Sequence, residues 1–189
     1  MKSKKLLIPS LVIAVAALLM VVSLFLPILS VNKEYKEKLD KAEGTVVELF
    51  GEDTKAEELK SISMVKFAKL MNAKEEASGG DTIASTVLTV MNYLIAGFAV
   101  VTLVVGLIRL PVVSIITDLV STGFFTVYLL LLMEGINRAK EVYHLGFAGY
   151  FFFIVAAIAL VASVWLLIAK KKYKKEKAEK EKKEEAEKK

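Results

Sequence analysis

The chain has 189 residues, of which 55% are hydrophobic, and its formal net charge is +5. It contains no cysteine, which excludes a disulfide framework, a thiolate metal site and a cysteine nucleophile. A soluble domain of this length cannot bury the long apolar stretches found here, so the composition excludes an ordinary soluble globular protein.

Four long apolar stretches are separated by charged residues. Segments 6–32, 82–108 and 145–169 contain no Asp, Glu, Lys, Arg or His, and the stretch 110–133 contains only Asp118. The hydrocarbon core of a bilayer is about 30 Å thick, and about 20 helical residues cross it. The sequence therefore predicts an all-α membrane protein, a bundle of four transmembrane helices. The predicted spans are 6–30, 82–108, 111–133 and 146–169.

The first predicted span follows a short basic leader, residues 1–5, which contains three lysines. A basic leader before an apolar stretch is typical of a signal peptide, but this stretch exceeds the roughly 7–15 apolar residues of a signal-peptide core. No small-residue cleavage pattern follows it. We therefore expect an uncleaved membrane anchor.

Residues 31–81 form the longest segment between two predicted spans, and we expect a mainly helical extracytoplasmic domain there. A first helix is predicted over 32–43, where helix formers are frequent. Residues 45–50 are ambiguous between strand and helix. A capping-box pattern, Thr54 followed by Glu57, predicts a second helix from residue 54 to about residue 77.

The apolar residues of this second predicted helix do not fall on one helical stripe. We expect them to pack either on the outer rim of the bundle or on a partner protein. The candidate partner surface consists of Leu59, Ile62, Phe67, Leu70 and Met71.

A two-residue turn, 109–110, leads into the third predicted span, which carries most of the polar side chains of the apolar stretches. Ser114, Asp118 and Ser121 recur at spacings of three and four, so they share one helical face. Lipid offers this face no hydrogen bonds, and it must therefore turn toward the other helices.

Matching residues by depth identifies partners for this face. Because the turn at Arg109 joins antiparallel spans, facing residues of the second and third spans have numbers that sum to about 220. Asp118 is then opposite Thr102, and Asn92 is opposite Tyr128. Ser163 lies near the level of Asp118 on the fourth span. The candidate intramembrane polar site comprises Asp118, Thr102, Ser121, Ser163, Asn92 and Tyr128.

Asp118 has three interpretations from sequence. In the first interpretation, its carboxylate binds a proton or a cation, since ionisable groups inside a membrane are commonly functional. Alternatively, it bonds to Thr102 or Arg109 and holds helices together. In the third interpretation the span begins later, and Asp118 is an interfacial N-cap.

The short outer loop 134–145 contains His144, the only histidine, three residues after Glu141. Glu-x-x-His binds metal when two copies face each other in a bundle, and one copy is present. The motifs of phosphate-binding loops, serine hydrolases and metalloproteases are also missing from the sequence. We therefore predict no cofactor, no metal and no enzymatic activity.

Lysines crowd both ends of the chain next to predicted spans. By the positive-inside rule these ends are cytoplasmic, which predicts a multi-pass protein of the plasma membrane with a cytoplasmic tail, 170–189. Glu alternates with Lys in this tail without an aromatic platform, so nucleic acid is not an expected partner. The lysines expected to contact anionic lipid are Lys170, Lys171, Lys172, Lys174 and Lys175.

The sequence supports two hypotheses about function. The favoured one is a non-enzymatic scaffold, accessory subunit or partner-binding protein that uses its outer domain and basic tail. Its expected partners are the lipid bilayer, other membrane or envelope proteins and, in a homo-oligomer, a second copy. The alternative is a small oligomeric transporter or channel that uses Asp118.

Overall fold

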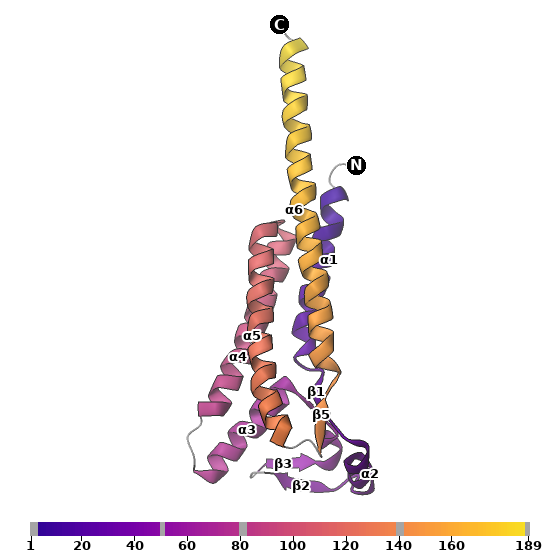
Figure 1. Ribbon diagram of the computed structural model, residues 1–189, viewed down its shortest axis with the longest axis vertical. Coiled ribbons are helices and arrows are strands. Elements are labelled where there is room, and N and C mark those ends of the chain that lie inside the picture. Colours follow the sequence, from indigo (N-terminus) through magenta and orange to yellow (C-terminus); the bar gives the residue numbers. More distant parts are fainter. Residues whose placement is uncertain (1–3, 50–51, 80–82, 139–141, 188–189) are drawn as a thin grey trace.

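The computed structural model describes residues 4–49, 52–79, 83–138 and 142–187 (Figure 1). Four helices in these ranges are long and apolar enough to span a membrane, which confirms this part of the sequence prediction. They are α1 (Lys4–Ser23), α4 (Ile83–Leu107), α5 (Pro111–Arg138) and α6 (Phe147–Glu187).

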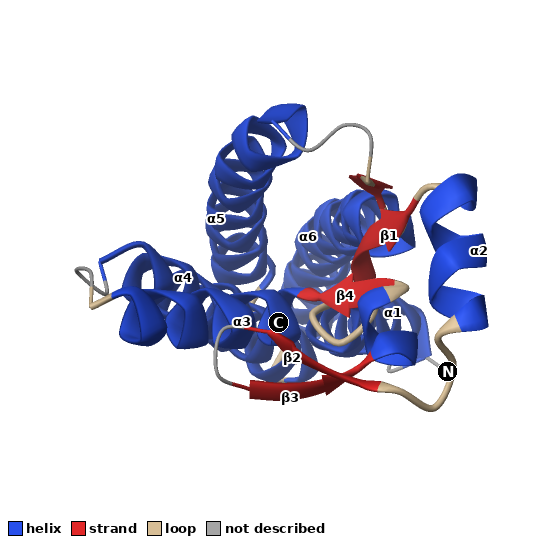
Figure 2. Cartoon of the chain, turned by 90° about the horizontal axis from the view of Figure 1, so that it is seen from below, coloured by secondary structure: helices blue, strands red, loops and turns tan. Residues whose placement is uncertain are grey.

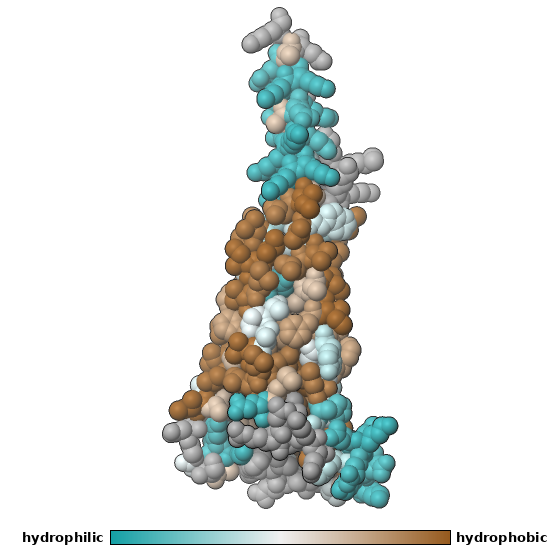
Figure 3. Space-filling view, viewed as in Figure 1, coloured by the Kyte–Doolittle hydropathy of each residue, from teal (hydrophilic) through white to brown (hydrophobic). Residues whose placement is uncertain are grey.

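Consecutive apolar helices lie side by side. The helix α4 packs between α1 and α5, and α6 packs against both α5 and α1, so the four helices close an up-and-down bundle. Both termini lie at the same end of the bundle (Figure 1). On the face seen in Figure 3, a broad apolar band covers the four helices, and the projecting part of α6 is hydrophilic. The apolar side chains exposed in this band are what lipid would contact.

A three-stranded antiparallel sheet covers the other end of the bundle. Its order is β4-β1-β5, with bounds Ser61–Ser63, Pro27–Val31 and Tyr143–Leu145. In the centre of the sheet, Leu29 of β1 is opposite Ile62 on one side and Leu145 on the other. The sheet thus connects the chain leaving α1 with the chain entering α6 (Figure 2).

This sheet corrects the predicted end of the first span. The apolar stretch was expected to be helical to residue 30, but α1 ends at Ser23 and β1 begins at Pro27. Proline has no backbone N–H and disfavours a helical residue before it, so it favours ending the helix. Apolarity alone did not distinguish the last residues of the helix from those of a buried strand.

The segment between α1 and α4 contains both helices and strands. After α2 (Lys33–Lys41) come an antiparallel hairpin of β2 (Val46–Leu49) and β3 (Glu52–Lys55) and the 3-10 turn η1 (Ala56–Leu59). The strand β4 then leads into α3 (Met64–Ser78). The expectation of a mainly helical domain is therefore too simple for this segment.

The helix predicted to start at Thr54 starts ten residues later. Thr54 pairs with Val47 in the hairpin, and the true N-cap is Ser63, whose side chain accepts a hydrogen bond from the Lys66 backbone N–H at 3.2 Å. The helix ends at Gly79, which has a φ of 62°. The capping-box pattern was present, but strand pairing took precedence over it.

The segment between α1 and α4 and the bundle share one apolar core. Phe125 of α5 stacks on Phe152 of α6, with ring centroids 3.9 Å apart. Three of the candidate partner residues, Leu59, Ile62 and Leu70, are buried. The other two, Phe67 and Met71, are partly buried against the same core. Burial within the chain removes Leu59, Ile62 and Leu70 from the candidate partner surface, and partner contact through Phe67 and Met71 stays a prediction.

The helices differ in length, and this difference shapes the end of the bundle next to the sheet. At 1.5 Å per residue, the 20 residues of α1 extend about 30 Å, whereas the 25 of α4 and the 28 of α5 extend about 37 and 42 Å. The first turns of α4 lie against α3, as Figure 2 shows. At the opposite end α6 continues as one helix of 41 residues through most of the tail.

Candidate functional site

A buried polar seam connects α4, α5 and α6 within the bundle. Thr102 of α4 donates to the hydroxyl of Thr117 at 2.7 Å, and the Thr117 hydroxyl in turn donates to a backbone carbonyl of its own helix. Ser114 of α5 and Ser163 of α6 are joined by a hydrogen bond of 2.9 Å. Ser121 donates to the backbone oxygen of Ile95 at 3.1 Å. Each hydroxyl of the seam thus has a partner within the chain.

Asp118 lies in this seam but is not bonded as depth matching suggested. It is 2% exposed, and its Oδ1 has no hydrogen-bond partner among the described residues. Thr102 meets Thr117 instead, one residue earlier, because a shift of one residue turns a side chain about 100° around the helix axis. The N-cap interpretation is wrong, since α5 begins at Pro111 and Asp118 lies in its second turn.

Asn92 and Tyr128 meet at the end of the seam nearest α3. The Asn92 side-chain amide donates to the Met64 carbonyl at 3.3 Å, and the Tyr128 hydroxyl donates to the same oxygen at 3.4 Å. The expected level of these two residues is therefore correct, but their common partner is the backbone at the start of α3. Sequence reasoning missed it because α3 was expected to begin ten residues earlier.

A groove of about 530 Å³ lies between α3 and the first turns of α4. The buried amide of Asn92 forms part of its wall, and the Oδ1 of that amide has no hydrogen-bond partner within the described ranges. Tyr93 is 74% exposed beside it, and Val65 and Val90 are also exposed. The groove is lined by Val65, Ala68, Lys69, Asn72, Thr86, Thr89, Val90, Asn92 and Tyr93.

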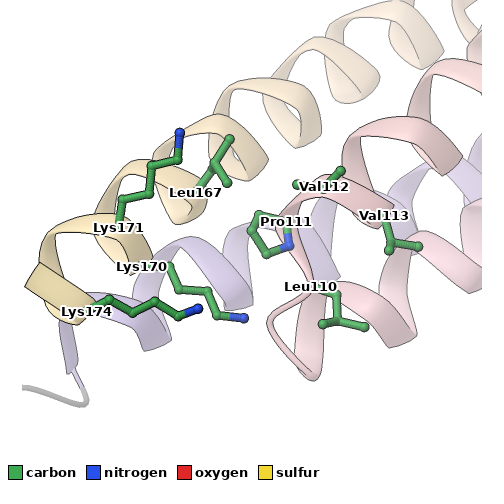
Figure 4. Close-up of a pocket in the computed structure, with 8 residues that line it drawn as sticks. All are labelled: Leu110, Pro111, Val112, Val113, Leu167, Lys170, Lys171 and Lys174. Carbon is green, nitrogen blue, oxygen red and sulfur yellow. The ribbon is translucent and has the colours of Figure 1, made fainter.

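A second groove, of about 310 Å³, lies at the opposite end of the bundle between the start of α5 and α6 (Figure 4). Three of the five lysines predicted to contact lipid line it, namely Lys170, Lys171 and Lys174. Lys172 and Lys175, on the same helix, are not among its lining residues. Lys170 also donates to the Arg109 carbonyl at 2.9 Å, which ties α6 to the turn between α4 and α5.

His144 contributes to the sheet end of the molecule. Its Nδ1 lies 3.0 Å from the side-chain oxygen of Asn32, while Glu141 is outside the described residues. Within the described ranges, no group of three His, Cys, Asp or Glu side chains could hold a metal ion. The absence of an enzymatic role remains a prediction.

Comparisons with protein-family models, with curated proteins and with solved structures found no match to this chain. The interpretation of the two grooves and the seam therefore depends on their own geometry.

Proposed function

We propose that this chain is a non-enzymatic, four-span membrane protein that binds another integral membrane protein through the groove between α3 and α4. The observation that carries the proposal is this groove, in which the exposed side chains of Val65, Val90 and Tyr93 gather between α3 and α4. A neighbouring membrane helix packed against these side chains would gain van der Waals contact along the groove.

The proposed membrane position follows from the four apolar helices and the lysines at the shared end of the termini. Lysines flank cytoplasmic ends of membrane helices, so this end would face the cytosol of a cell whose plasma membrane holds the protein. The sheet, α2, α3 and the groove between α3 and α4 would then be on the outer side. The lysine-rich extension of α6 would project into the cytosol.

The kind of partner follows from the position of the groove. Val90 and Tyr93 lie on α4, one of the four apolar helices, and both are exposed. A soluble protein would reach them only through the interfacial layer of the bilayer, whereas a neighbouring membrane helix would lie beside them. Exposed tyrosines that present a large amphipathic ring are frequent anchors of protein interfaces.

A photocrosslinking experiment in native membranes tests this proposal. A photoreactive phenylalanine replaces Tyr93 in the groove, and a matched control places it at Leu130, an exposed position of α5 outside the groove. We expect a discrete adduct from position 93, and its loss when Val65→Lys places a charge in the groove. The same adducts from both positions, or none from position 93, would contradict the proposal. An adduct of twice the chain mass would identify the partner as a second copy.

Transport is a second candidate function, and the buried Asp118 carboxylate favours it. Its Oδ1 lacks a hydrogen-bond partner in the described part of the chain, as an ion- or proton-binding oxygen would before its ligand arrives. The neighbouring hydroxyls, however, bond to one another or to backbone carbonyls. Proton or sodium flux into vesicles containing the purified protein would support transport if Asp118→Asn abolishes it. Flux that is the same with either residue would exclude Asp118 from the route.

A further inference from the structure

The groove between the start of α5 and α6 has an apolar floor and a basic rim. Its apolar lining comes from the beginning of α5 and from Leu167 of α6. The three lysines follow on α6, three, four and seven residues beyond Leu167. None of the eight lining residues is acidic. The groove is lined by Leu110, Pro111, Val112, Val113, Leu167, Lys170, Lys171 and Lys174.

Two of the three rim lysines extend toward the start of α5, and Lys171 extends to the other side of α6, near Leu167 (Figure 4). Lys170 and Lys174 extend from α6 toward the chain that carries Leu110 and Pro111 (Figure 4). The hydrogen bond from Lys170 to the Arg109 carbonyl holds α6 against the start of α5, so the groove is built from parts that are joined to each other. Lys171 and Lys174 are both exposed. Because Lys171 and Lys174 are cations beside an apolar surface, the groove is complementary to a molecule that is apolar at one end and anionic at the other.

The position of the groove identifies this occupant. In the proposed membrane position, the lysines lie at the level of the lipid headgroups, and Val112 and Leu167 lie among the upper acyl chains. A free phosphate ion would leave the apolar floor uncovered, and a zwitterionic lipid would bring a cation near the three lysines. An anionic phospholipid satisfies both parts of the groove.

We propose that this groove binds one anionic phospholipid of the inner leaflet. An acyl chain lies on Pro111, Val112 and Leu167, and the phosphate lies among Lys170, Lys171 and Lys174. This inference rests on the membrane position proposed above but not on partner binding by the outer groove. Lipid binding by this groove and partner binding by the groove between α3 and α4 can therefore fail separately.

A tryptophan placed in the groove provides a direct assay. Trp165 lies two residues before Leu167 on α6 and faces the opposite side of the helix, so it is replaced by Phe. Val113, an exposed lining residue of the groove, is replaced by Trp. The full chain is placed in phosphatidylcholine nanodiscs that contain a minority of phosphatidylglycerol brominated near the glycerol. Quenching of the fluorescence of this tryptophan is compared with that produced by the same fraction of brominated phosphatidylcholine. Because a lysine near the membrane surface contributes about fivefold in affinity for anionic lipid, we expect at least a fivefold preference for phosphatidylglycerol.

Two pairs of variants separate the groove from general attraction to a basic tail. The first replaces Lys170, Lys171 and Lys174 by Gln, and its control replaces Lys180, Lys182 and Lys183, which removes the same charge farther along α6. The proposal expects the preference to disappear in the first variant and to persist in its control. An equal loss in both variants would overturn it.

The second pair leaves the charge unchanged. Val112→Phe fills the floor of the groove from an exposed position, and Val161→Phe adds the same bulk at an exposed position of α6 outside the groove. We expect Val112→Phe to reduce the preference severalfold and Val161→Phe to leave it intact. A preference that survives Val112→Phe would also overturn the proposal, because the acyl chain would then not occupy the groove.

Discussion

Gly106 marks a close approach of α1 and α4, and replacing it by alanine should destabilise the bundle. A Cβ at this position would lie 2.5 Å from Cγ2 of Ile13, about 0.9 Å closer than the 3.4 Å at which ordinary contacts begin. The Ile13 side chain is fully buried and β-branched, so it cannot easily turn away. The contact is also held by Ser10, which donates to the Gly106 carbonyl at 2.5 Å.

The expected loss follows from this overlap. Overpacking a well-packed core typically costs about 1–3 kcal/mol, and we expect Gly106→Ala to lower the free energy of unfolding by that amount. Gly97, on the same helix, is the matched control, since a Cβ there meets nothing within 4 Å. Gly97→Ala should be neutral or slightly stabilising because alanine is the better helix former.

Reversible unfolding of the detergent-solubilised protein by added SDS, followed by circular dichroism, measures these values. Ile13→Ala removes the methyl group at 2.5 Å and keeps the Cβ at 3.1 Å, so in that background the cost of Gly106→Ala should fall below the cost in the wild-type chain. If Gly106→Ala is as stable as Gly97→Ala, or if its cost is unchanged by Ile13→Ala, the close approach is not what requires glycine here.

Two further predictions concern the sheet end. Gly146→Ala should destabilise the protein by about 3 kcal/mol or more, which is the upper end of overpacking costs. The added Cβ would lie 2.5 Å from the backbone oxygen of Pro27, and a backbone atom cannot rotate away as a side chain can. The same SDS titration measures this loss, and a loss smaller than that of Gly106→Ala would refute the ranking. Burial raises the pKa of the Tyr143 hydroxyl above its usual value near 10, so its stabilising contribution is complete below pH 10 and is lost as the pH rises through the raised value. Unfolding free energies of wild type and Tyr143→Phe, compared between pH 8 and 11, should therefore converge or cross at the alkaline end, and parallel curves would contradict this.

The local sequence was sufficient to predict the four long helices and the depth of their residues. An apolar run of about 20 residues without charge has few stable conformations other than a helix when it is buried or in lipid. A tight turn at Arg109 fixes which residues of α4 and α5 lie at the same level. For this reason the levels of Asn92 and Tyr128, and of Thr102 with the first part of α5, were correct.

The rotation of each helix, the outer sheet and the grooves needed the tertiary structure. Residue counting gives depth along a helix but not the direction in which a side chain points, so Thr102 was paired with Asp118 instead of Thr117. Each strand of the outer sheet has only three to five residues, and β1 finds partners more than 30 and more than 110 residues away in the chain. Such short strands carry little periodicity of their own and form because distant segments supply their hydrogen bonds. The grooves likewise arise from which helices meet, and no single stretch of sequence contains that information.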